Sequence, residues 1–146
     1  MEQFKKDNYF KETGKILDVL SLNANLSEFV FKNLLIDLKI PESNKNIFAN
    51  IDNSCDEKII LNAINTNNGF KYLLREINST ISQVPNQLFL IWNNEMVDLC
   101  TKEILISNWE SIWYGEGDEA LIIYIPNLIV LIIHDWGEVG IKKINN

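Results

Sequence analysis

Residues 121–125, Leu-Ile-Ile-Tyr-Ile, and residues 128–133, Leu-Ile-Val-Leu-Ile-Ile, decide the fold of this chain. Both runs are of strand length and rich in β-branched residues. Pro126-Asn127 lies between them, and because proline fixes φ near about −65° a wide type I loop is expected there. Polar residues do not alternate within either run, so both faces of these strands should be covered by other parts of the chain. The two runs are therefore predicted to be central strands of a sheet.

Further strands are predicted on either side of this hairpin. Residues 88–92 and 96–100 flank Asn93-Asn94-Glu95, and asparagine tolerates the positive φ of a tight hairpin turn. Residues 139–144 alternate after the Asp135-Trp136-Gly137 turn and should return as a partly exposed edge strand. The sequence pattern of residues 101–107 does not distinguish a strand from a helical turn. The C-terminal part is thus predicted to be an antiparallel meander of about 4–6 strands.

The pattern of the first half is typical of helices. Ser27 is a candidate cap for one of them, and Ser54 followed by Glu57 has the spacing of a capping box. The predicted helices cover residues 4–20, with a break at Gly14, and residues 27–38, 56–65 and 70–84. The expected fold class is α+β, with N-terminal helices packed on a C-terminal antiparallel sheet. No linker divides residues 1–146, so a single domain is predicted.

Length and composition indicate an ordinary globular protein. At 146 residues, with 47% hydrophobic and 23% charged residues, the chain can bury a core without disulfides or metals. Cys55 and Cys100 lie far apart and form no metal-binding motif, so buried thiols are expected. The polar start and the lack of a membrane-spanning apolar run predict a cytosolic protein that does not bind membranes.

The negative charge is concentrated in one part of the sequence. Of the formal charge of −7, residues 1–92 contribute −1, whereas residues 93–141 carry nine acids and one base, which is −8, before two lysines follow. All four tryptophans also lie at or after position 92. Arg75 is the only arginine and is interpreted as a solvated helix residue, so the guanidinium groups that read nucleic acids are missing. A nucleic-acid partner is not predicted.

His134 is the only histidine and the only candidate general base of its type. Neighbouring strand residues point to opposite faces, so Asp135 can orient the imidazole only if the chain turns there. We interpret His134 as a strand-end residue that is hydrogen-bonded locally. The chain has no sequence motif of a nucleotide-binding, metalloprotease or serine-hydrolase site, and it is not predicted to be an enzyme.

An acidic loop offers a second candidate site. Glu116, Asp118 and Glu119, with Asp135 and Glu138 nearby, could hold a hard cation through oxygen ligands. Their spacing matches no EF-hand, and we interpret the loop as a solvated turn whose acids keep the ends of the sheet soluble. No metal or cofactor is therefore predicted.

The tryptophans allow two interpretations. Trp109 and Trp113 are four residues apart and share a face in a helix or in a strand, which favours a place in the core beside the central hairpin. The alternative is that some of the aromatic residues are contact residues for a partner, because Trp and Tyr are enriched at interfaces and are surrounded by acids here.

A resemblance adds to this picture. The run Asn-Trp-Glu-Ser-Ile-Trp-Tyr-Gly-Glu-Gly-Asp-Glu-Ala over residues 108–120, followed by Leu-Ile-Val-Leu-Ile-Ile-His-Asp-Trp-Gly-Glu-Val over residues 128–139, resembles the C-terminal ends of small uncharacterised bacterial α+β proteins. It is also similar in style to immunity proteins of bacterial polymorphic-toxin and contact-dependent inhibition systems. This resemblance implies a cytosolic, acidic, single-domain protein that neutralises a cognate toxin, often a basic nuclease, by covering its active site.

The sequence therefore predicts a protein-binding inhibitor, an immunity protein whose partner is a basic toxin domain. A phage-type anti-defence protein that imitates nucleic acid and a small hydrolase centred on His134 are the alternatives. A homodimer is also possible, because a second subunit could cover the central strands. The predicted partner-binding residues are Trp92, Glu95, Asp98, Glu110, Trp113, Tyr114, Glu116, Asp118, Glu119, Asp135, Trp136 and Glu138.

Overall fold

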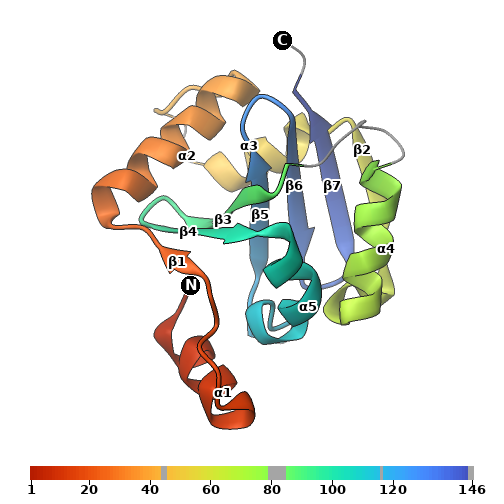
Figure 1. Cartoon of the computed structure of the whole chain (residues 1–146). Helices are drawn as coiled ribbons and strands as arrows, with labels where there is room; N and C mark the ends of the chain where they lie inside the picture. Colours follow the sequence, from red (N-terminus) through yellow and green to blue (C-terminus); the bar gives the residue numbers. More distant parts are fainter. Residues whose placement is uncertain (44–45, 79–84, 116, 145–146) are drawn as a thin grey trace.

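The computed structural model describes residues 1–43, 46–78, 85–115 and 117–144. In these residues, five α-helices and one short 3-10 helix alternate with seven strands, which confirms the α+β class (Figure 1). The elements are α1 (Gln3–Thr13), β1 (Leu20–Ser21), α2 (Ala24–Leu38), α3 (Ile47–Ser54), β2 (Glu57–Ile60), η1 (Asn62–Asn65), α4 (Asn67–Asn78), β3 (Gln87–Asn93), β4 (Met96–Thr101), α5 (Lys102–Ile112), β5 (Ala120–Ile125), β6 (Ile129–His134) and β7 (Glu138–Lys143).

The strands form one antiparallel sheet in the order β1-β4-β3-β5-β6-β7-β2. The two strands predicted to be central are central, and Ala120–Ile125 pairs with Ile129–His134 along its whole length. The β3–β4 hairpin is also confirmed. The sheet is not a simple meander, because β3 rather than β4 pairs with β5 after the chain has passed through α5.

Helices cover both faces of the sheet, as expected from the lack of polar residues in its central strands. Leu121 and Ile123 lie in a core with residues of α4 and α5, whereas Ile122 and Tyr124 lie in a second core with residues of α2 and α3. Figure 1 shows these pairs of helices on opposite sides of the strands. The chain's own helices thus bury the central strands, and no second subunit is needed to cover them.

The two edges of the sheet differ from the prediction. Residues 139–144 were expected at an edge, but β7 pairs with β2, in a register that places Glu57 opposite Ile141. The helix predicted over residues 56–65 is wrong, since this segment forms β2 and a 3-10 turn. The Ser54 hydroxyl donates to the carbonyl of Ile51 instead of capping a new helix. The N-terminal half therefore supplies both edge strands, and helices and strands are interleaved.

The helices of the first half begin and end at other residues than expected. α1 ends at Gly14, whose φ of 70° is the left-handed conformation that favours glycine, so residues 15–20 are not helical. α2 is capped by Asn23, whose side chain accepts from the Leu26 amide. Ser27 is buried within α2, and its hydroxyl accepts from the Val97 amide of β4. Residues 79–84 of the predicted helix 70–84 lie outside the described residues.

In the described part of the chain no helix is long and apolar enough to cross a membrane.

Candidate binding groove

Two adjoining cavities, of about 570 and 430 Å³, lie near the end of the sheet where β3 ends and β5 begins. Phe48 at the start of α3 lines both cavities, and the neighbouring residues Asn93 and Asn94 line one each. We call the two cavities together the Phe48 groove. The first cavity is lined by residues that include Glu28, Phe31, Lys32, Leu35 and Glu42, and the second by residues that include Glu2, Lys5, Trp92, Asp118 and Glu119.

The charges of the Phe48 groove do not balance. Five carboxylates line it against two lysines, which leaves a formal charge of −3. Each lysine is already paired inside the groove, Lys32 with Glu28 at 3.2 Å and Lys5 with Asp118 at 2.5 Å. The hydrogen bond to Glu28 and the nearby negative charges raise the pKa of Lys32. Among the described residues no ion pair within 4.0 Å involves the three other carboxylates, which belong to Glu2, Glu42 and Glu119.

Lys5 lines the second cavity of the groove and is held there by several contacts. Its side chain is 1% exposed, and its ammonium group donates to the Ile112 carbonyl at 2.9 Å as well as to Asp118. The same ammonium lies 4.1 Å from the centroid of the Trp92 ring and 5.0 Å from that of Tyr114, at cation–π distance. α1 is thereby attached to the loop before β5, and Trp92 lies between the Lys5 ammonium group and the Asp98 carboxylate.

Asp98 was predicted to contact a partner, but it lies in the core with 0% exposure. Its carboxylate pairs with the amino group of Met1 and accepts from Ser21 Oγ at 2.6 Å and from Trp92 Nε1 at 2.7 Å. Burial lowers the pKa of the Met1 amino group, although the hydrogen bond to Asp98 opposes this. Asp98 therefore fixes the back of Trp92 and is not available to a partner.

Several other predicted residues gather at the groove end of the sheet. Ala120 pairs with His134 across the central strands, and the Asp135 amide donates to the Glu119 carbonyl, which places the β6–β7 turn beside the groove. Trp136 in this turn is 62% exposed. The predicted residues in the groove or in the turns beside it are Trp92, Glu95, Asp118, Glu119, Asp135, Trp136 and Glu138.

Three other predicted residues do not line the groove. Trp113 is 1% exposed and stacks on Trp109, so the interpretation as a core residue is the right one for this pair. Glu110 is exposed on α5, and Tyr114 packs edge-on against Phe4. Glu116 lies outside the described residues.

Sequence reasoning missed the part of the groove that comes from before Trp92. Glu2, Glu28, Glu42 and Phe48 belong to a segment whose acids and lysines nearly cancel, so the charge count gave no signal. The excess appears only after folding, because of the described lysines in this segment only Lys5 and Lys32 line the groove.

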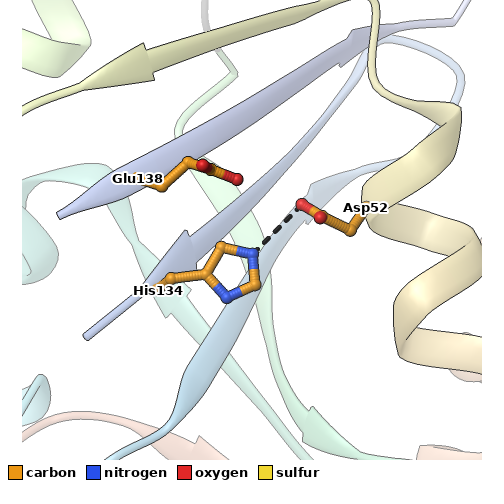
Figure 2. A group of neighbouring side chains, drawn as sticks. All are labelled: Asp52, His134 and Glu138. Atoms are coloured by element: carbon orange, nitrogen blue, oxygen red, sulfur yellow. Dashed lines mark hydrogen bonds and ion pairs between the residues drawn. The ribbon is translucent and has the colours of Figure 1, made fainter. Parts of the chain in front are cut away.

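His134 has a partner that its neighbours in sequence did not suggest. Its Nε2 lies 3.1 Å from an Asp52 carboxylate oxygen on α3, 82 residues away, and its ring stacks on Trp136 with centroids 4.2 Å apart (Figure 2). The expectation of a local hydrogen bond is therefore wrong. Burial raises the pKa of Asp52, but hydrogen bonds from His134 and Lys58 outweigh it, and the pKa lies below its usual value.

Comparisons with known proteins give no relative for this chain. No protein-family model, no curated protein and no solved structure matches it. The class of molecule that can be stated is an acidic α+β protein with a three-layer arrangement and a negatively charged groove at one end of its sheet.

Proposed function

We propose that the protein is a protein-binding inhibitor, an immunity protein that neutralises a basic toxin domain, and that the Phe48 groove receives the toxin. The observation that carries this proposal is the groove's formal charge of −3, with the carboxylates of Glu2, Glu42 and Glu119 outside any ion pair of the described residues. Carboxylates that serve only to keep a protein soluble need not lie together around a concave surface.

The groove combines two kinds of contact that stable complexes use. Half-buried Phe48 provides apolar surface next to Phe31 and Leu35, which are only 5% and 2% exposed, and carboxylates line both cavities. A suitable partner segment has one apolar or aromatic side chain between lysines or arginines. The apolar side chain would be buried in the groove, and the basic side chains would pair with its carboxylates. The surrounding negative field would accelerate the encounter with a basic domain and suppress binding to acidic proteins.

The test is a binding titration with the toxin domain encoded beside this gene. A complex is expected at low salt that weakens as salt is added, because screening shortens the range of the attraction. The double variant Glu42→Lys and Glu119→Lys should weaken it by roughly 10–100-fold, mainly through slower association.

Glu103→Lys is the control outside the groove, and it reverses one charge where the double variant reverses two. Glu103 is exposed at the start of α5, where the Lys102 amide donates to Asn86, at the opposite end of β3 from Asn93. This variant should bind like the unchanged protein. No complex at low salt would contradict the proposal. Equal losses in the groove variant and in the control would contradict the assignment of the groove. Binding to a nucleic-acid-binding protein instead of the toxin would favour the nucleic-acid mimic.

A further inference from the structure

Three side chains that could ligate a metal ion converge beside the groove. Asp52 from α3, His134 from the end of β6 and Glu138 from the start of β7 each direct one ligand atom inward, and these atoms all lie within 4.8 Å of one another. Figure 2 shows the three side chains pointing toward a common point between the sheet and α3. We infer that they form a binding site for a divalent transition cation such as Zn²⁺.

The donor set suits such a cation. One imidazole nitrogen and two carboxylate oxygens are all ligands that zinc accepts, whereas Mg²⁺ and Ca²⁺ favour oxygen alone. In a tetrahedral site with bonds of about 2.1 Å, neighbouring ligand atoms are about 3.4 Å apart. The 3.1 Å between His134 Nε2 and Asp52 Oδ1 is close to that spacing. The Glu138 side chain is 23% exposed, and a change of its rotamer would close the remaining distance.

The site already attracts a positive charge. The ammonium of Lys58 on β2 lies 3.0 Å from an Asp52 oxygen and 3.7 Å from a Glu138 oxygen, so it bridges the two carboxylates that would hold the metal. The Lys58 side chain is 42% exposed and can turn into solvent without leaving a buried gap. Metal and ammonium therefore compete for the same carboxylates, and Lys58 sets the affinity of the site.

The imidazole is held in place for this role. The side chain of His134 is 12% exposed, and the Trp136 ring lies nearly parallel to it, at an interplanar angle of 16°. Three protein ligands leave a fourth position for water or for a group of a bound partner. The site lies beside Glu119, since the Asp135 amide bonds to the Glu119 carbonyl, so a bound cation would stand next to the acidic groove.

The experiment is calorimetric titration of the protein, without any histidine tag, with ZnCl₂ at neutral pH. One equivalent should bind. Lys58→Met should bind about tenfold more tightly, because the competing ammonium is removed. His134→Ala and Glu138→Gln should each bind at least about tenfold more weakly, whereas Glu57→Gln, an exposed residue further along the β2–β7 pair, should be unchanged. MgCl₂ should give no comparable heat.

A second readout does not depend on heat. His134 is the only histidine, so its imidazole nitrogen signals can be followed by NMR without assignment. One equivalent of Zn²⁺ should shift the Nε2 signal of the unchanged protein. In Lys58→Met the same addition should saturate the site, and the variant should remain folded. Failure of both the unchanged protein and Lys58→Met to bind Zn²⁺ would overturn the inference. Equal affinity in His134→Ala would overturn it as well. Either result leaves the toxin-binding proposal untouched, since that proposal uses no metal.

Discussion

The ammonium group of Lys5 lies 2.5 Å from a carboxylate oxygen of Asp118, although the two residues are 113 positions apart in the chain. Both side chains are largely buried, at 1% and 11% exposure. The pair attaches α1 to the loop before β5 and holds Asp118, which also accepts from the Tyr114 amide, at the wall of the Phe48 groove.

Replacing Lys5 by methionine should lower the free energy of unfolding by about 3 kcal/mol, since it leaves the Asp118 carboxylate without its buried partner. Lys11→Met, on the same helix and exposed, removes the same charge and should change stability by less than about 0.5 kcal/mol. Urea unfolding of both variants measures the difference. Equal midpoints would mean that the Lys5–Asp118 pair contributes nothing net.

Gly140→Ala should destabilise the protein by about 1–3 kcal/mol through overpacking. A Cβ at this position would lie 2.8 Å from both the Cys55 sulfur and the Ile132 Cγ2. Adding Cys55→Ala to Gly140→Ala should recover part of the loss. Gly117→Ala, whose new Cβ would meet nothing nearer than 3.8 Å, is the control. Thermal unfolding of the four proteins checks the order, and a neutral Gly140→Ala would show that β7 can shift relative to α3.

Trp136 should account for most of the tryptophan fluorescence that acrylamide quenches. It is 62% exposed, whereas Trp109 and Trp113 are at most 1% exposed and donate their indole N–H groups to Ile64 and Asn65. Trp136→Phe keeps a ring against His134 and should remove most of the quenchable signal without changing the unfolding midpoint. An unchanged quenching slope in this variant would place the accessible ring elsewhere, with half-buried Trp92 the next candidate.

The two thiols should make stability fall at alkaline pH. Burial raises the pKa of Cys100 to about 12 and that of Cys55 to about 11. Folding favours the protonated thiols, so their contribution is fully present below pH 9, the pKa of an unfolded thiol, and is lost as the pH rises toward these values. For Cys100 the loss is at most about 1.4 kcal/mol per pH unit.

Unfolding free energies at pH 7, 9, 10 and 11 measure this effect. The double variant Cys55→Ala and Cys100→Ala should start from a lower stability at pH 7 but lose less of it between pH 9 and 11. Parallel curves for the variant and the unchanged protein would assign the alkaline loss to other groups, such as Tyr124, whose pKa is also raised by burial and by its bond to Asp37.

The sequence was sufficient for the centre of the fold. The β5–β6 and β3–β4 hairpins could be predicted because their strands are long, apolar and joined by turns with defined chemistry. β2 could not, because it has four residues, three of them exposed, and it exists only by pairing with β7. Its capping-box pattern was a local signal that tertiary pairing overrode.

The site was predictable only in part, for a similar reason. The acids of the second half could be listed from the charge count, but their partners could not. Asp52 meets His134 across 82 positions, and Phe48 enters the groove from a helix with no charge signal. Contacts of this kind depend on how α3 lies on the sheet, which periodicity does not specify.

The interleaved order of the sheet has a consequence for how the chain is made. β1 and β2, the two edges, leave the ribosome before any of the strands they must pair with, and β2 waits for β7, 84 positions later between Glu57 and Ile141. The first half of the chain therefore cannot finish folding while it is being synthesised, and its exposed apolar helices must wait for the last strands. Pairings so distant in sequence fold slowly. We expect a nascent chain halted before β7 to remain accessible to chaperones and proteases until synthesis resumes and β7 pairs with β2.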